Sequence, residues 1–382
     1  MASPCPVGTV RRAGLAALAA APFGLAYRFA LVYRARAGYP RRQPPRLTPI
    51  ELGLAFETTV VRSGDLDLPA WFIPARDGAP GPGVVLVHGW ESGRDRTLPM
   101  AIFLQAAGFH CLTFDVRGHG ANPAEEMPIS AGEFGLDALA GFVALLARPE
   151  VTVGAIAGHS MGAIGAILAA AADQRVAAVV STSAPADPYR LTRQTFRLAR
   201  LPIPDPIAYP LAWLTTRIYL RPRGHVVSEI DATRAIARYA GPVLLAHGTD
   251  DAVVPPSHME RLAKSARAAR WARAGEDSPA PVETLLIEGG HHSWLYEEAD
   301  YRRAVATFLA TALGGPLPPE EAGQIAADTT ADRIPDGEAR FTAVAEHPGG
   351  LRTLARVALP GATEPVNRDE EAVPAAAGKD TA

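Results

Sequence analysis

Short runs of consecutive apolar residues recur through the middle of the chain, separated by stretches in which apolar positions have a helical spacing. The runs cover residues 84–87, 110–114, 153–157, 176–180, 243–246 and 284–287. Because each run is apolar throughout rather than alternating, it predicts a strand buried on both faces, as in a parallel sheet. Between two runs, Leu136, Leu139, Val143 and Leu146 recur every three or four residues, which indicates an amphipathic helix. Alternating strands and helices predict a doubly wound α/β domain.

Two segments depart from this alternation. Residues 58–61 and 68–73 flank Ser63-Gly64-Asp65 and predict an antiparallel hairpin that leads into the sheet. Residues 187–230 mix prolines with aromatic residues and arginines. A structureless connection of that length would be unusual inside a compact domain, so we expect a small helical cap there. A plain long connection is the alternative.

The N-terminal segment, residues 1–49, differs from the rest. Arg11-Arg12 precede the apolar residues 13–33, which contain Pro22 and Arg28 and have about the length that crosses a bilayer. We expect an uncleaved membrane anchor; a cleaved signal or a helix lying on the domain are the alternatives. Arginines beyond residue 33 favour a cytoplasmic location for the domain that follows. Prolines in residues 40–49 indicate a linker, so removing residues 1–46 should leave a soluble, active domain.

The alternation of strands and helices ends near residue 313. Residues 314–382 are rich in proline, alanine and acidic residues, so we expect a largely disordered tail with at most one short helix within 341–359. The expected division is therefore a segment 1–49, a domain 50–313 with its cap at about 187–230, and the tail 314–382.

The amino-acid composition excludes several classes of protein. With 382 residues, 48% of them hydrophobic, the chain can build a large core. A net charge of −3 gives no general field for nucleic acid, so we expect no nucleic-acid partner. The two cysteines, Cys5 and Cys111, exclude a disulfide framework and a cysteine-ligated zinc or iron–sulfur site. We expect no metal and no cofactor.

The strongest chemical motif is Gly158-His159-Ser160-Met161-Gly162. It follows the run 153–157 and precedes the small apolar residues 163–172, which places G-x-S-x-G in its strand–turn–helix context. The glycines are needed because a side chain there would collide with the neighbouring strand or helix. The sharp turn exposes the serine hydroxyl above the sheet. A small-residue packing turn without chemistry is the alternative.

Two further motifs follow predicted strands. Residues 247–255 read His-Gly-Thr-Asp-Asp-Ala-Val-Val-Pro and follow the run 243–246, while Gly289-Gly290-His291-His292 follow 284–287. Both stand at carboxyl ends of strands, where open α/β sheets build their sites. The chain order Ser160, Asp251, His291 is that of the α/β-hydrolase triad.

With these motifs, residues 57–313 resemble the α/β-hydrolase superfamily, and within it the serine-aminopeptidase or lysophospholipase-like branch. The matching motifs are His88-Gly89-Trp90, Asp115-Val116-Arg117-Gly118-His119-Gly120, residues 158–162 and residues 247–255. The resemblance implies the α/β-hydrolase fold: a mostly parallel central sheet flanked by helices, with a small helical cap.

The resemblance also implies roles for individual residues. Ser160 matches the nucleophile, and Val254-Pro255 set the frame that makes Asp251 the acid rather than Asp250; Asp187 is a further alternative. The family places histidine directly after glycine, so His291 is the expected base and His292 its alternative. The backbone amides of Trp90 and Met161 match the oxyanion hole. His88, Asp115, Arg117 and His119 are expected to fix loops.

The expected function is a serine hydrolase that cleaves a carboxylic ester or thioester through an acyl-enzyme. Its partner would be a small-molecule, lipid-derived acyl substrate, with membrane association through residues 13–33. A serine-aminopeptidase-type peptidase, an acyltransferase and a non-catalytic, membrane-associated binding module are the alternatives. Ser160, in place of an aspartate at the elbow, disfavours dehalogenase and epoxide-hydrolase chemistry.

Overall fold

The computed structural model describes residues 7–274, 280–329, 354–355 and 357–365. Within these residues the sheet has eight strands in the order β1-β2-β4-β3-β5-β6-β7-β8. The β1–β2 and β2–β4 pairs are antiparallel, and all the others are parallel. The strands are β1 (Glu57–Ser63), β2 (Leu66–Ile73), β3 (Gly81–Val87), β4 (His110–Phe114), β5 (Val151–His159), β6 (Val179–Thr182), β7 (Val243–Gly248) and β8 (Val282–Ile287).

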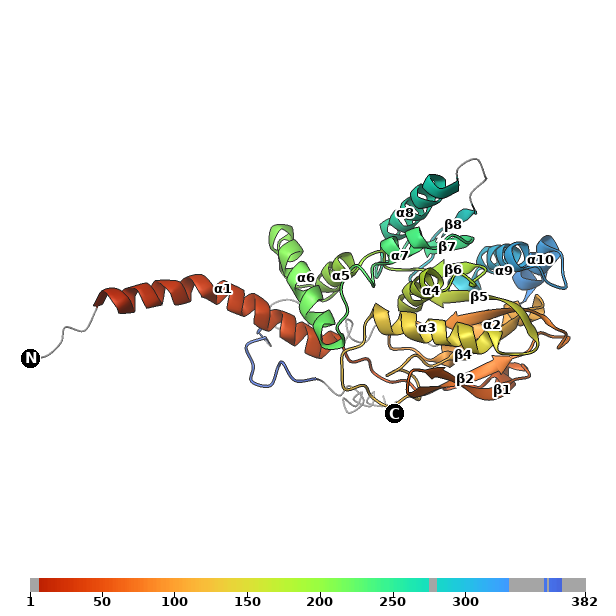
Figure 1. The fold of residues 1–382 in the computed structure, drawn as a ribbon, viewed down its shortest axis with the longest axis horizontal. Coiled ribbons are helices and arrows are strands. Elements are labelled where there is room, and N and C mark those ends of the chain that lie inside the picture. The colour runs from red at the N-terminus through yellow and green to blue at the C-terminus, as the bar shows by residue number, and fades with distance from the viewer. Residues whose placement is uncertain (1–6, 275–279, 330–353, 356, 366–382) are drawn as a thin grey trace, which may run out of the picture.

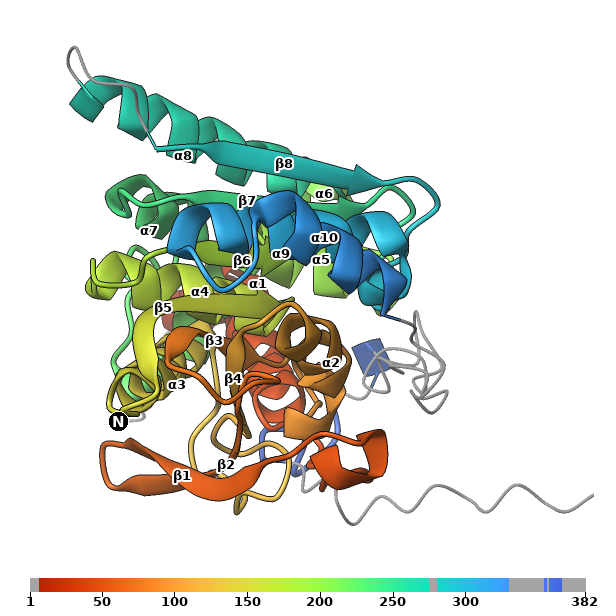
Figure 2. The same ribbon diagram turned by 90° about the vertical axis from the view of Figure 1, so that its right-hand side faces the viewer.

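Helices cover both faces of this twisted sheet (Figures 1 and 2). One hydrophobic cluster packs α3 (Ala131–Leu146), α4 (Met161–Ala172), α7 (Ala232–Arg238) and α8 (Ser257–Ala274) against one face. A second cluster packs α2 (Leu98–Ala106), α9 (Ala299–Leu313) and α10 (Pro319–Asp328) against the other. The mostly parallel, helix-flanked sheet predicted from the sequence is confirmed.

Strand β3 shows why the apolar runs are continuous. Val85 and Val87 enter one cluster, and Val84 and Leu86 the other. Successive side chains of a strand point to opposite faces, so both sets must be apolar when both faces are covered. The expected run 176–180 differs in extent, because β6 begins only at Val179.

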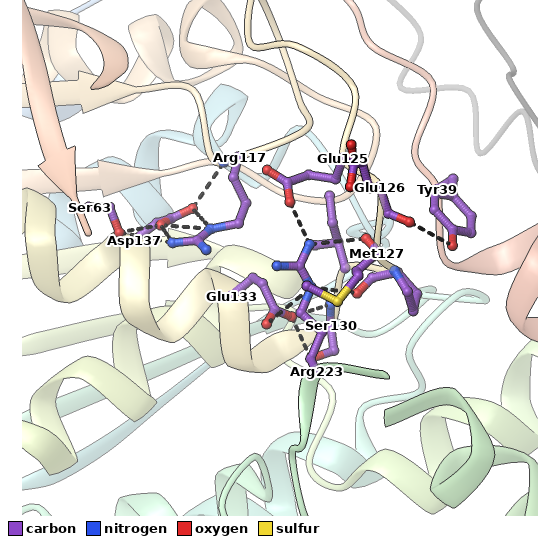
Figure 3. A network of polar contacts seen from close by, with 12 residues as sticks. Tyr39, Ser63, Arg117, Glu125, Glu126, Met127, Ser130, Glu133, Asp137 and Arg223 are labelled. Atoms are coloured by element: carbon purple, nitrogen blue, oxygen red, sulfur yellow. Dashed lines mark hydrogen bonds and ion pairs between the residues drawn. The ribbon is translucent and has the colours of Figure 1, made fainter. Parts of the chain in front are cut away.

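The cap over the carboxyl ends of the strands consists of α5 (Pro188–Leu198), α6 (Asp205–Leu220) and the short 3-10 helix Arg221–Arg223. Asp187 begins α5 by accepting a hydrogen bond from the Arg190 amide at 2.9 Å. Figure 3 shows how Arg223 ties the cap to the body: its guanidinium donates to the Glu125 carboxylate at 2.6 Å and to the Met127 carbonyl at 3.0 Å.

The N-terminal segment is not the detached unit expected from the sequence. Helix α1 (Val7–Ala37) is continuous, and its C-terminal part packs in the domain beside α6, with Ala30 and Ala35 buried. The Tyr33 hydroxyl lies 2.9 Å from that of Thr195, and the Gly38 carbonyl accepts from the Ile129 amide at 2.8 Å. Among the described residues, no helix has the length and apolar character that a membrane crossing requires.

The domain also extends beyond residue 313. Helix α10 packs on α9, and the Arg302 guanidinium donates to the carbonyls of Ala326 at 3.0 Å and Ala327 at 2.7 Å. The expectation of a largely disordered tail is therefore wrong for Pro319–Asp328. Most of the short helix expected within 341–359 lies outside the described residues. Farther along, the carbonyls of Val357 and Leu359 accept hydrogen bonds from Arg28 of α1.

Candidate active site

Ser160 occupies a sharp turn between β5 and α4. Its φ of 54° and ψ of −116° are strained for a residue with a side chain. The flanking glycines make the turn possible: a Cβ at Gly158 would collide with the carbonyl of Gly162, and one at Gly162 with the carbonyl of Val87. The sequence-based interpretation of this motif as a strand–turn–helix elbow matches the geometry.

Asp251 lies buried in the loop after β7. Its Oδ1 atom accepts hydrogen bonds from the amides of Val253 at 2.9 Å and Val254 at 2.8 Å, which fix the carboxylate. Burial alone would raise the pKa of Asp251, but hydrogen bonds from His247 and His292 outweigh it and hold that pKa well below its usual range. The carboxylate is therefore charged across the physiological range.

His292 connects these two residues. Its Nδ1 lies 2.8 Å from Oδ2 of Asp251, and its Nε2 lies 3.0 Å from Oγ of Ser160. All three side chains are buried to within a few per cent. The structure thus brings together Ser160, Asp251 and His292, with the nucleophile–base–acid geometry of a triad.

The sequence-based choice of His291 is corrected by one residue. His291 is exposed, and its Nδ1 lies 3.5 Å from the carbonyl oxygen of Asp250, the neighbour of the triad aspartate. Two contacts explain the shift. Gly290 packs on β7 so closely that a Cβ at Gly248 would collide with its carbonyl, and that carbonyl accepts from the Asp250 amide at 2.9 Å. Gly289 and Gly290 form this turn, so His292, and not His291, faces Ser160.

Two histidines that sequence reasoning left without a role support the triad. His247 donates from Nε2 to the Val254 carbonyl at 2.7 Å, and the same nitrogen lies 3.1 Å from Oδ2 of Asp251. His159 lies 2.7 Å from the carbonyl oxygen of His292 through its Nε2. Burial first, and the neighbouring His292 second, lower the pKa of His159 to about 4. Both stand in motifs already singled out. The partners of His247 lie within the same motif, whereas the partner of His159 lies 133 residues farther along the chain.

The residues expected to fix loops do so. His88 donates from Nδ1 to the Gly89 carbonyl at 2.8 Å and accepts from the Val116 amide at 3.0 Å. Asp115 accepts from the Arg94 amide and guanidinium, each at 2.7 Å. Arg117 pairs with the Asp137 carboxylate (Figure 3). His119 donates from Nδ1 to the Arg117 carbonyl at 2.9 Å. None of these contacts touches the triad.

The loop that holds Trp90 also approaches Ser160. A Cβ at Gly89 would lie 3.3 Å from the Cβ of Ser160, so the backbone that leads into Trp90 passes directly beside the elbow. Met161 begins α4, and the amides at the first turn of a helix point away from it, unpaired within the helix. Trp90 and Met161 both line the cavity above Ser160.

That cavity has a volume of about 270 Å³. Ser160 lies in its wall, and most of the other lining residues come from α1, α5 and α6 and from the loop after β6. Most of the lining side chains are apolar, including Phe29, Val32, Leu191, Phe196, Leu201 and Ile230. Among the described residues, no group of three or more His, Cys, Asp or Glu side chains could hold a metal ion.

Comparison with known proteins gives one family. A model of the alpha/beta hydrolase family matches residues 84–308. Two uncharacterised proteins of Mycobacterium tuberculosis, from strains CDC 1551 and H37Rv, are each 30% identical over 210 residues, which span 54% of this chain and 66% of theirs. The chain thus matches just under two thirds of the length of these relatives.

Solved structures share the fold at low identity. An esterase of Pyrococcus furiosus superposes with a TM-score of 0.54 at 22% identity, over 72% of this chain and 100% of that one. An acylaminoacyl peptidase of Pyrococcus horikoshii gives a TM-score of 0.52 at 17% identity, over 74% and 47%. A puromycin-hydrolyzing peptidase of Mycobacterium tuberculosis gives 0.51 at 20%, over 71% and 41%.

Proposed function

Since the chain belongs to the alpha/beta hydrolase family, we propose that it is a serine hydrolase that cleaves a carboxylic ester or thioester with an apolar acyl group. The observation that carries this proposal is the pair of hydrogen bonds that His292 makes to Ser160 and Asp251. A buried serine, histidine and aspartate in this order and geometry are suited to nucleophilic catalysis, in which the histidine activates the serine hydroxyl.

The proposed reaction begins when Nε2 of His292 takes the hydroxyl proton of Ser160 while Oγ attacks the carbonyl carbon. The Asp251 carboxylate stabilises the resulting imidazolium. The backbone amides of Trp90 and Met161 would donate to the oxyanion, with an effect of about 3–4 kcal/mol for each donor in such sites. His292 then gives its proton to the leaving alcohol or thiol, and the acyl group remains on Ser160. Water, activated by His292, releases the acid.

The cavity favours an acyl chain over a peptide N-terminus. Binding an α-ammonium group calls for a free carboxylate, and the acid that lines this cavity is Asp187. That carboxylate already accepts from the Arg190 amide and lies 3.3 Å from the Arg190 guanidinium and 3.9 Å from that of Arg261. The apolar walls instead suit a hydrocarbon chain.

A panel of p-nitrophenyl esters of increasing chain length, set against aminoacyl p-nitroanilides, tests this proposal. We expect ester hydrolysis with a preference for medium chains, and a loss of at least about 10³-fold in kcat/KM for Ser160→Ala with unchanged Tm. Faster cleavage of the anilides would favour the peptidase alternative. Transfer of the acyl group to an added alcohol in preference to water would favour the acyltransferase. Unchanged turnover in Ser160→Ala would refute the assignment.

A further inference from the structure

The part of α1 that precedes the cavity exposes large apolar side chains. Leu15, Leu18, Phe23 and Leu25 are 62%, 76%, 77% and 65% exposed. Figure 1 shows this half of the helix extending from the body past α6. Such a run of exposed leucine and phenylalanine is costly in water and indicates a surface with an apolar partner.

The neighbouring cap helix continues this surface. On α6, Ile207, Tyr209 and Trp213 are each half exposed or more. Two arginines lie over the aromatic rings: Arg193 is 4.2 Å from the ring centre of Tyr209, and Arg217 is 3.8 Å from that of Trp213. We call the exposed apolar residues of α1 and α6 the α1–α6 surface.

The two segments of the chain that contain this surface are rich in positive charge. Residues 1–46 contain eight arginines and no acidic residue, and residues 187–230 contain seven arginines against three acidic residues. These two segments together carry a formal charge of +12, whereas the whole chain carries −3, so the rest of the chain carries −15. The surface therefore complements an anionic partner, which the remainder of the molecule would repel.

We propose that the α1–α6 surface docks on an anionic lipid bilayer, with the N-terminal half of α1 lying in the interface. Exposed leucine and phenylalanine beside tryptophan, tyrosine and arginine are the side chains that bind at this boundary. A nucleic acid would satisfy the charge but not the four large apolar residues of α1. A second copy would satisfy the apolar residues but would bring like charges together.

The docking surface is continuous with the cavity. Phe23 is exposed, and Phe29, six residues later on the same helix, lines the cavity wall; the separation is about 9 Å along the axis. Arg28 donates to the Val357 and Leu359 carbonyls, so the C-terminal half of α1 is bound to the domain and is not available to the bilayer. If the proposed function holds, docking brings the cavity next to the lipid that supplies the acyl chain.

Vesicle flotation of the full chain tests the docking. The probes are phosphatidylcholine vesicles with and without 30% phosphatidylglycerol. We expect binding to the anionic vesicles, and at least a tenfold weaker partition for Leu18→Glu/Phe23→Glu, because two apolar side chains no longer enter the interface. Arg217→Gln, which removes an exposed arginine of this surface, should weaken binding to anionic vesicles alone, by about fivefold. The matched control is Trp271→Glu, which changes an aromatic residue of α8 that is 70% exposed and should bind like the wild type.

The outcomes separate docking from hydrolysis. Ser160→Ala should float like the wild type, so binding stands even if ester cleavage fails. Wild-type protein that stays unbound, or a Leu18→Glu/Phe23→Glu variant that binds fully, overturns the proposal. A dimer in light scattering that these substitutions dissociate, without vesicle binding, would assign the surface to a second copy. If the α1 variant fails to fold, as judged by its Tm, the arginine variant still decides.

Discussion

The Nε2–H of His159 donates to the carbonyl oxygen of His292 over 2.7 Å. The residue directly before Ser160 thus holds the backbone of the histidine that faces Ser160. Because burial keeps the pKa of His159 at about 4, its ring is neutral at physiological pH and adds no charge beside His292. This bond joins the serine turn to the loop after β8, two segments that meet at the proposed reaction centre.

Loss of this bond should impair turnover more than substrate binding. We expect His159→Ala to lower kcat by about 10–100-fold with little change in KM, because the base loop would lose its registration with the nucleophile. His159→Gln keeps an N–H donor and should recover part of the rate. Steady-state kinetics of both variants on a soluble ester measure this. Equal losses in the two variants, or a change confined to KM, would argue against a positioning role.

Substitutions of the adjacent residues Asp250 and Asp251 should have very different effects on kcat. Asp251→Asn removes the charge that orients and stabilises protonated His292, so we expect a loss of about 10³-fold or more in kcat. Asp250 is exposed and its carboxylate accepts from the Thr249 hydroxyl at 3.4 Å, away from His292, so Asp250→Asn should stay within about threefold of the wild type. Comparable losses would show that the acid has been misassigned.

The serine turn could be predicted from the sequence, whereas the base could not. Gly158, Ser160 and Gly162 lie within five residues of one another. The steric reason for the two glycines is therefore local and can be recognised as a sequence motif. The choice between His291 and His292 depends on how Gly290 packs against Gly248, a contact between segments about forty residues apart. A one-residue register of that kind is set by tertiary packing.

The structure of the N-terminal segment also depends on contacts with residues that are distant in the sequence. The segment's length and apolar composition favoured a membrane anchor, and a helix lying on the domain was only an alternative. Arg28 suggested an interruption of the apolar stretch. The partners of Arg28 are carbonyls of Val357 and Leu359, more than three hundred residues away. Likewise, the composition of residues 319–328 suggested a tail, whereas Ala322 and Ala326 are buried against the second hydrophobic cluster.

Two truncations should therefore separate the halves of α1. Deleting residues 1–24 should leave the Tm nearly unchanged. Deleting residues 1–46 should lower it by roughly 5–10 °C or more, because each buried apolar side chain contributes about 1–3 kcal/mol and each kcal/mol shifts Tm by about 2–4 °C. It should also abolish the preference for longer acyl chains, since Phe29 and Val32 leave the cavity wall. An unchanged Tm and chain preference in the longer deletion would restore the detached-segment interpretation.

The contact between the His225 ring and Glu133 should make stability depend on pH. The hydrogen bond that the His225 Nε2–H donates to the Glu133 carboxylate raises the pKa of His225 above its ordinary 6.5. Despite burial, the same bond lowers the pKa of Glu133 below 4.5. The His225 contribution is complete below about pH 6.5 and disappears as pH rises through its raised pKa. The Glu133 contribution is complete above about pH 4.5 and disappears as pH falls.

The pair therefore contributes most between about pH 4.5 and 6.5. Wild-type protein should lose part of its Tm between pH 6 and pH 9, and His225→Gln should show a smaller loss over the same range. Thermal unfolding across that range provides the measurement. Identical pH slopes in the two proteins would show that the pair does not stabilise the cap.

The central claim is that His292, not its neighbour, activates Ser160. Labelling with a fluorophosphonate probe, with the modified residue mapped by mass spectrometry, tests it most directly, because only an activated serine reacts quickly. We expect rapid labelling at Ser160 in the wild type and in His291→Ala, and a labelling rate at least about 10³-fold lower in His292→Ala. Rapid labelling of His292→Ala, or loss of labelling in His291→Ala alone, would contradict it.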